Sequence, residues 1–269
     1  MKKSIVSALL LGVVLLFLYL PIVILAVYSF TDSTTIGAIR HFSLSNYRVL
    51  FTTPELKHMI GGTFLLAIGS ALLATLLGTL GAIGAFYSRR VGKTTISILN
   101  QIPVINADVV TAFSLCIMLV VVCGVDKNTF FPLVIGHTIL CAPFVYLSVM
   151  PKLKQMDSNY YEAALDLGAT PLQALNKVIL PHILPGILSG FVLSITLSLD
   201  DYFVTTYTKP ATFDTISTYV VNATKGEQTE IKTALWALST VIFIIVVIAV
   251  WMMNILAKNA EEVQDYEAI

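Results

Sequence analysis

Residues 162–181 read EAALDLGATPLQALNKVILP and lie between two long hydrophobic stretches. Asp157 or Ser158 can cap a short helix at the start of this segment, because a side-chain oxygen there accepts a free backbone N–H. Gly168 can adopt the positive φ with which many helices end. The sequence therefore predicts a short helix that stops at Gly168.

A second helix is predicted directly after this corner. Thr170 can act as its N-cap, with Pro171 at the first helical position and Gln173 at the third, which is the pattern of a capping box. Apolar residues then recur on one helical face until a proline is expected to stop the run: Leu172, Leu175, Ile179 and Pro181. We expect residues 157–182 to form a rigid helical elbow outside the bilayer that docks against a protein partner.

The composition is that of a membrane protein. Hydrophobic residues make up 57% of the chain and charged residues only 12%, whereas about a quarter of the residues in a soluble domain are charged. The mean hydropathy is +0.85. Six stretches without charged residues are each near or above the roughly 17 to 25 residues that a spanning helix needs: 4–31, 58–88, 109–125, 128–151, 178–199 and 233–257. The predicted fold is an all-α integral membrane protein with six transmembrane helices.

The distribution of Lys and Arg favours a cytoplasmic N-terminus. This orientation leaves a modest excess of basic residues inside and concentrates Arg89, Arg90 and Lys93 in one short cytoplasmic loop. With six spans, the C-terminus and the elbow between spans four and five also lie in the cytoplasm. Lys2 and Lys3 precede an apolar run that is long for a signal peptide and lacks a clear cleavage site, so we expect a retained first helix.

The predicted spans are unevenly connected. Residues 1–57 comprise the first span and a long outer loop, and residues 258–269 form a cytoplasmic tail. The five spans within residues 58–257 have short connections, apart from the elbow and an outer segment after Thr208. We expect these five spans to form the packed transmembrane domain.

The chain lacks the residue patterns of an enzyme or of a nucleic-acid-binding protein. Cys116, Cys123 and Cys141 fall within predicted spans without paired spacing, and the four histidines show no metal-ligand spacing. The sequence contains no glycine-rich phosphate-binding loop and no basic patch with interleaved aromatic residues. We therefore expect the chain to hold no cofactor or metal, to bind no nucleic acid and not to hydrolyse ATP itself.

Asp108 lies at the start of the third predicted span. It follows a polar stretch that contains Gln101, Pro103 and Asn106. Irregular backbone at membrane depth is tolerated only where it lines a cavity or is covered by protein, and an ionised side chain there is costly. Asp108 is therefore a candidate for the solute path. The alternative is an interfacial residue, or the N-cap of a helix that starts at Val109.

Asp200 and Asp201 are the second candidate site. Asp200 follows His182 by about eighteen residues, or roughly 27 Å of helix, which places it near the outer edge of the hydrocarbon. Two adjacent carboxylates followed by aromatic residues such as Tyr202 suit an ammonium group through ion pairing and cation–π contact. Neighbouring helix positions diverge by about 100°, so one carboxylate can face the path and the other a neighbouring helix. The alternative is a solvated helix end.

The elbow resembles the EAA loop of permease subunits of ABC importers. The pattern of that loop is Glu-Ala-Ala, three residues, Gly, nine residues, Ile, any residue and Leu-Pro. This chain matches it at Glu162, Ala163, Ala164, Gly168, Leu180 and Pro181, with Val178 in place of Ile. The resemblance implies that the elbow docks into a cytoplasmic ATPase and transmits its motion, and that ATP and Mg are bound by that partner.

A second resemblance is narrower. Residues 198–204 read SLDDYFV and residues 208–210 read TKP, which is similar to the Ser-Leu-Asp-Asp run and later Gly-Pro of spermidine/putrescine permeases of the "C" type. The likeness extends over nearly the whole chain. Lys209 stands where that group has Gly, and Ala107 replaces the Pro that usually precedes the residue equivalent to Asp108.

The resemblance implies one subunit of an ATP-driven importer in the plasma membrane of a bacterium. The chain would form half of the path for polyamines, in a heterodimer with a second permease subunit, together with two ATPase subunits and an external polyamine-binding protein. The residues implied for the path are Asp108, Asp200, Asp201 and Tyr202. Two alternatives stay open. One is an importer permease for another small solute, such as a thiamine-like cation or a metal chelate, and the other is an ATP-independent carrier or channel.

Overall fold

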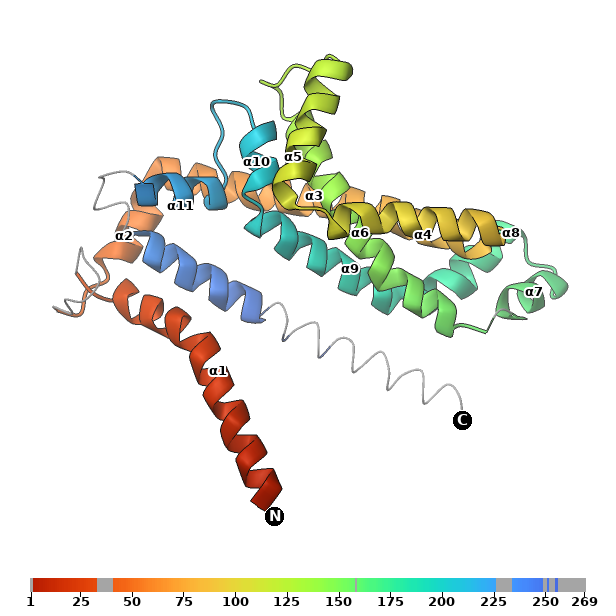
Figure 1. The fold of residues 1–269 in the computed structure, drawn as a ribbon, viewed down its shortest axis with the longest axis horizontal. Helices are drawn as coiled ribbons and strands as arrows, with labels where there is room; N and C mark the ends of the chain where they lie inside the picture. Colours follow the sequence, from red (N-terminus) through yellow and green to blue (C-terminus); the bar gives the residue numbers. More distant parts are fainter. Residues whose placement is uncertain are drawn as a thin grey trace. The chain divides into compact units, whose positions relative to one another are not determined.

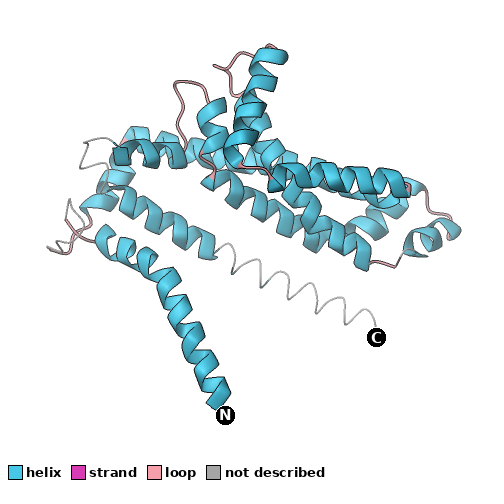
Figure 2. Cartoon of the chain, in the orientation of Figure 1, coloured by secondary structure: helices cyan, strands magenta, loops and turns pink. Residues whose placement is uncertain are grey.

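The computed structural model describes residues 2–32, 41–157, 159–225 and 234–248, together with residues 251 and 255. Within these residues the chain is helical, as predicted (Figure 2). The only extended pairing among them is an isolated bridge between Thr31 and Phe42. The helices, most of them labelled in Figure 1, are α1 (Lys2–Ser29), α2 (Ser45–Thr52), α3 (Pro54–Tyr87), α4 (Arg90–Ile105), α5 (Asp108–Cys116), the π-helix η1 (Ile117–Val122), α6 (Phe131–Gln155), α7 (Asn159–Asp166), α8 (Pro171–Ala174), the π-helix η2 (Leu175–Ile179), α9 (Leu180–Asp200), α10 (Phe203–Thr208), α11 (Ile216–Lys225) and an unlabelled helix, Ala234–Ile248.

The chain divides into two compact units. One combines the residues up to His58 with residues 219–252, and the other is centred on residues 59–218. The organisation into 1–57, 58–257 and 258–269 that the sequence suggests stays a prediction.

In the first unit, α1 is held to α2 and to a later helix. The buried side chain of Asn46 donates hydrogen bonds to the carbonyls of Ser29 and Thr31, at 3.2 and 2.9 Å. The ring of Tyr28 packs edge-on against Trp236, with ring centroids 5.5 Å apart. The helix that carries Trp236 is thereby packed against the end of α1.

Four stretches of the described residues are helical, long and apolar enough to cross a membrane: Leu9–Ser29, Pro54–Tyr87, Phe131–Gln155 and Pro171–Asp200. They correspond to the predicted spans 4–31, 58–88, 128–151 and 178–199. The predicted span 233–257 is represented by the shorter apolar helix Ala234–Ile248. An all-helical fold with several spanning helices is therefore confirmed, whereas the number six stays a prediction.

The predicted span 109–125 differs from the structure. Its helix, α5 with η1, pairs with α4 at an angle of 106°, and Figure 1 shows α5 turning away from α4. The break lies at Asn106 and Ala107, whose backbones are extended, whereas Pro103 lies inside α4. The expected short basic loop is in part helix, because α4 begins at Arg90. The polar and basic residues of α4 interrupt the hydrophobic pattern by which a span is recognised.

Small residues allow α6 to pack closely against α3 and α9. A Cβ atom added at Gly78 of α3 would lie 2.6 Å from the Cβ of Val145 and 2.7 Å from the carbonyl oxygen of Ala142. A Cβ atom added at Gly190 of α9 would lie 3.0 Å from the Cα of Val145. Figure 1 shows α6 and α9 side by side. Val145 of α6 is fully buried and lies close to both neighbouring helices.

Candidate functional site

The elbow has the corner and the caps that the sequence predicts. Its first helix, α7, ends shortly before Gly168, which has a φ of +86°. The Thr170 hydroxyl accepts a hydrogen bond from the backbone N–H of Gln173 at 3.3 Å, and the Gln173 side chain accepts one from the backbone N–H of Thr170 at 2.9 Å. The predicted capping box is therefore confirmed. Asp157 accepts the N–H of the first residue of α7 at 3.0 Å, and Ser158, the other candidate cap, lies outside the described residues.

The prediction that Pro181 stops the second helix is wrong. The helix continues from α8 through η2 into α9, and Pro171–Asp200 forms one span. The π turn closes with a bond from the Leu180 N–H to the Leu175 carbonyl. This wider turn leaves one carbonyl without a donor, so the N–H that Pro181 lacks is not needed there. The second helix of the elbow is therefore continuous with the span behind it.

The corner of the elbow offers surface to a partner. Leu167 and Leu172 are 90% and 67% exposed. The residues of the EAA pattern divide into an exposed group, Glu162, Ala163, Gly168 and Pro181, and a half-buried group, Ala164 and Leu180. Two exposed leucines beside exposed polar positions give the elbow both apolar and polar contact area.

Two aromatic contacts join α7 to the long helices. The ring of Tyr161 packs against Tyr87 at the end of α3, with centroids 5.4 Å apart. The ring of Tyr160 packs edge-on against His182 near the start of α9, at 6.3 Å. The helix α7 therefore contacts the end of α3 and the start of α9.

A cavity of about 300 Å³ brings together all four residues that the sequence predicts for the solute path. The four are Asp108, Asp200, Asp201 and Tyr202. They come from the start of α5 and from the junction of α9 with α10. The rest of the wall is mostly apolar and includes the rings of Phe144 and Phe203. Carboxylates and aromatic faces thus meet at one site, although they are far apart along the chain.

The two adjacent aspartates have different surroundings. The Asp201 side chain is only 5% exposed. It accepts hydrogen bonds from the N–H groups of Val204 and Thr205, at 3.2 and 2.7 Å, and from the Thr205 hydroxyl at 2.9 Å. Asp200 is exposed, and its side chain forms no hydrogen bond or ion pair with the residues that the structure describes. Asp200 therefore presents a free charge to the cavity, whereas the charge of Asp201 is engaged by the N-terminus of α10.

Asp108 is the first residue of α5, and Ala107 is the N-cap. The alternative that Asp108 caps a helix starting at Val109 is therefore wrong by one residue. The exposed carboxylate lies at the end of α5 where the helix dipole favours negative charge, and it also lines the cavity.

Lys209, which departs from the polyamine-permease pattern, is paired within its own loop. Its Nζ atom lies 2.8 Å from a carboxylate oxygen of Asp214 and donates to the carbonyl of Phe213 at 2.8 Å. Lys209 is not among the described residues that line the cavity. Its positive charge is thus compensated by Asp214.

The sequence patterns do not reveal a buried polar chain next to the cavity. His137 of α6 is fully buried, with Nδ1 2.7 Å from the Ser198 hydroxyl and Nε2 3.0 Å from the Thr205 hydroxyl. The Ser198 hydroxyl lies 3.3 Å from that of Ser70 in α3. The one available signal was an ionisable residue inside a predicted span. Its partners, however, are 61 and 68 residues away, so no local pattern connects them.

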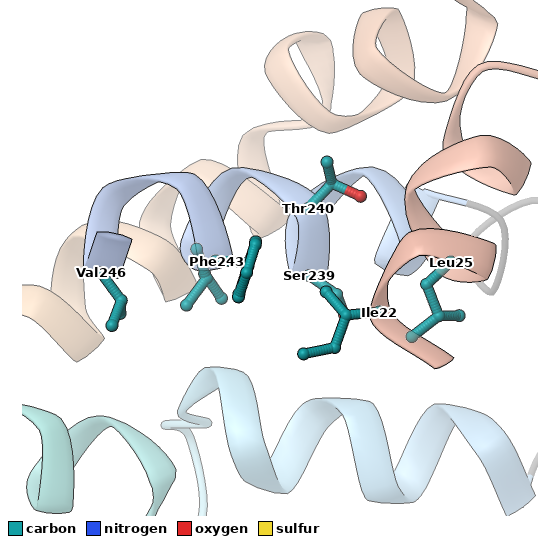
Figure 3. Close-up of a pocket in the computed structure, with 7 residues that line it drawn as sticks. Ile22, Leu25, Ser239, Thr240, Phe243 and Val246 are labelled. Atoms are coloured by element: carbon teal, nitrogen blue, oxygen red, sulfur yellow. The ribbon is translucent and has the colours of Figure 1, made fainter. Parts of the chain in front are cut away.

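A second cavity, of about 340 Å³, lies in the other unit between α1 and the helix Ala234–Ile248 (Figure 3). Its wall is apolar apart from Ser239 and Thr240. Among the residues that the structure describes, none that lines it carries a charge.

These features define a membrane permease. The described residues form several helices that are long and apolar enough to span a membrane, a partly open cavity is lined by carboxylates and aromatic rings, and a polar helical elbow extends from one span. Residues 74–262 match the family described as binding-protein-dependent transport system inner membrane component. The chain belongs to this family of importer permeases, so it is a transport subunit and not an enzyme.

Individual relatives agree with this assignment. The chain is 31% identical over 244 residues to the spermidine/putrescine transport system permease protein PotC of Escherichia coli (strain K12), with 90% of each chain covered. It is 30% identical over 197 residues to the putrescine transport system permease protein PotI of the same organism, with 71% of this chain and 70% of PotI covered. A chain of a solved bacterial alginate ABC transporter, in complex with an alginate pentasaccharide-bound periplasmic protein, has the same fold, with a TM-score of 0.69, 20% identity, and 96% of this chain and 95% of that chain covered.

Proposed function

We propose that this chain forms half of the passage for polyamines, such as spermidine and putrescine, in an ATP-driven importer. The observation that carries the proposal is the cavity lined by Asp108, Asp200, Asp201 and Tyr202. Polyamines are chains of ammonium groups separated by methylene segments. Carboxylates and aromatic faces attract ammonium groups, and an apolar wall accommodates the methylene segments.

The free charges of the cavity support a polycationic cargo. Asp108 and Asp200 are both exposed and line the same cavity. The rings of Phe144 and Phe203 belong to its apolar wall. The nearby cation Lys209 is compensated by Asp214, so it does not oppose the entry of a positively charged solute. The names of PotC and PotI, which refer to spermidine and putrescine transport, point to the same cargo.

The importer would contain this chain, a second permease subunit, two ATPase subunits that bind ATP and Mg, and an external polyamine-binding protein. The exposed elbow, with Glu162 and Gly168 at its centre and Ala163, Ala164, Leu180 and Pro181 around them, would dock on the ATPase. The periplasmic protein bound in the alginate transporter supports a comparable partner on the opposite side. In this arrangement the chain spans the inner membrane of a bacterium six times, with both termini in the cytoplasm.

Transport would proceed by alternating access. ATP can shift the passage between two states only to the extent that it binds one state better than the other. The helical span Pro171–Asp200 begins within the elbow and ends at the cavity. A displacement of the elbow by the ATPase would therefore reach the carboxylate of Asp200 through one continuous element.

Replacing Asp200 with asparagine is expected to lower spermidine uptake about tenfold. The change keeps the shape of the side chain and removes a free charge. A hydrogen bond between an ammonium group of the cargo and this charge would contribute about 1.5–3 kcal/mol, and the lower end of this range corresponds to about a tenfold change. Asp108 remains at the cavity, so uptake should not be abolished. The measurement is the initial rate of uptake of labelled spermidine by cells that lack the native chain and produce each variant at matched levels.

Asp126→Asn is the matched control, because Asp126 is exposed outside the cavity and accepts an N–H that asparagine can also accept. It should support uptake at the wild-type rate. Wild-type uptake by the Asp200→Asn variant would contradict the role of Asp200 in the path. If the wild-type chain itself fails to restore spermidine uptake, the polyamine assignment is wrong.

A further inference from the structure

His137 is buried beside the cavity residue Asp201 and does not line the cavity itself. Its side chain is 0% exposed, and its Nε2 atom lies 3.6 Å from a carboxylate oxygen of Asp201. A polar, ionisable side chain inside a spanning helix is costly compared with a hydrophobic one. This cost indicates that His137 has a role that a leucine or phenylalanine at the same position could not fill.

The direction of the hydrogen bonds around His137 follows from their acceptors. The Thr205 hydroxyl has a single hydrogen to donate. Its Oγ1 atom lies 2.9 Å from a carboxylate oxygen of Asp201 and 3.2 Å from the Asp201 carbonyl oxygen. Because both oxygens only accept, Thr205 donates to Asp201 and accepts from the Nε2–H of His137. The Nδ1 atom of the neutral ring then accepts from the Ser198 hydroxyl. The hydrogen bonds therefore form a chain: Ser198 of α9 donates to His137 of α6, His137 donates to Thr205 of α10, and Thr205 donates to Asp201.

Asp201 links this chain of hydrogen bonds to the cavity wall. Its carboxylate accepts the N–H groups of Val204 and Thr205 and so holds the first turn of α10. Tyr202, the N-cap of α10, and Phe203, its first residue, both line the cavity. The placement of their rings therefore depends on how the Asp201 carboxylate is oriented.

The helices α6 and α10 also approach closely at this point. A Cβ atom added at Gly136, the residue before His137, would lie 2.7 Å from a methyl group of Val204 and 3.5 Å from the methyl group of Thr208. This contact leaves α10 little freedom to slide along α6. The buried histidine and the close packing therefore fix the same end of α10.

We propose that His137 is a positioning residue for the cargo cavity. Through Thr205 it holds the Asp201 carboxylate on the N-terminus of α10, and it thereby sets the aromatic wall formed by Tyr202 and Phe203. In this arrangement Asp201 holds the first turn of α10 in place, while Asp108 and Asp200 supply the free charges. The inference rests on the proposed polyamine passage and names a residue of that passage which does not touch the cargo.

Three substitutions test this role in the complete importer, purified with its partner subunits and reconstituted in liposomes with the loaded binding protein. Thr205→Val removes the hydroxyl that links His137 to Asp201 and keeps the side-chain shape. Thr205→Ser restores the hydroxyl. Thr208→Val removes a hydroxyl from the same helix; among the described residues this hydroxyl donates only to the Val204 carbonyl. The readout is the amount of spermidine transported per ATP hydrolysed, which is independent of how much protein is folded.

Thr205→Val is expected to lower spermidine transported per ATP about tenfold, because it leaves the Nε2–H of His137 without its acceptor. Thr205→Ser and Thr208→Val should keep the wild-type ratio. If Thr205→Val lowers transport and ATP hydrolysis in equal proportion, or behaves like Thr208→Val, the hydrogen-bond chain only stabilises the fold and the inference is overturned. If the wild-type importer moves no spermidine, the proposed function fails, and this inference fails with it.

Discussion

Replacing Gly168 with valine is expected to lower solute uptake about a hundredfold while leaving the chain in the membrane. Gly168 has a φ of +86°, and holding a β-branched residue in this region costs up to about 3 kcal/mol, which depletes the bent corner about a hundredfold. No atom of the described residues lies within 4 Å of a Cβ added at Gly168. The loss would therefore come from the backbone conformation and not from a clash.

Gly168→Asn is the matched control, because asparagine adopts positive φ more readily than other residues with a side chain. It should retain much of the uptake. Both variants are compared by labelled-solute uptake and by the ATP hydrolysis that the loaded binding protein stimulates in the purified importer. We expect the valine variant to lose this stimulation, because the elbow no longer fits its partner. Normal uptake by the valine variant would show that the elbow is not the coupling element.

Replacing Gly78 with alanine is expected to produce the largest loss of stability, about 3 kcal/mol at the upper end of the range for overpacking. The added Cβ would lie 2.7 Å from the carbonyl oxygen of Ala142 and 2.6 Å from the Cβ of Val145. Neither atom is the end of a flexible side chain, so α3 and α6 would have to move apart. The measurement is the midpoint of thermal unfolding of the purified protein, together with the amount of protein found in the membrane.

Gly69→Ala provides the control for this substitution. Gly69 lies in the same helix, and a Cβ added there meets no atom of the described residues within 4 Å. Alanine is a better helix former than glycine by about 1 kcal/mol, so this variant should unfold at the wild-type temperature or above it. Equal unfolding temperatures for the two variants would mean that the close approach at Gly78 does not stabilise the protein.

The elbow shows how far local sequence patterns reach. The capping box at Thr170 and Gln173 and the positive φ at Gly168 were predicted and are present. Each depends only on residues within about four positions of one another, where the geometry of a helix end decides the outcome. The prediction that the helix stops at Pro181 was wrong for a related local reason. The π turn Leu175–Ile179 precedes Pro181 and tolerates the missing N–H, which the interior of an α-helix does not.

The third span shows what a hydrophobic pattern misses. The stretch 109–125 was predicted as one span, whereas the structure pairs α5 and η1 with α4 across a bend of 106°. Hydropathy records how apolar a window of residues is and carries no information on its direction. The bend is set by two residues with extended backbone, Asn106 and Ala107, at the site where Asp108 joins the cavity.

The sequence by itself determined that the chain is a helical membrane protein with an ABC-importer elbow, and it selected Asp108, Asp200, Asp201 and Tyr202 as path residues. Composition, caps and motifs are properties of neighbouring residues, so they can be read along the chain. Only the tertiary structure decided that these four residues share one cavity, that Asp201 is engaged by α10 while Asp200 is free, and that His137 stands behind them. The contacts responsible join residues as far as 128 positions apart, and the packing of helices against one another, which no local pattern encodes, brings such residues together.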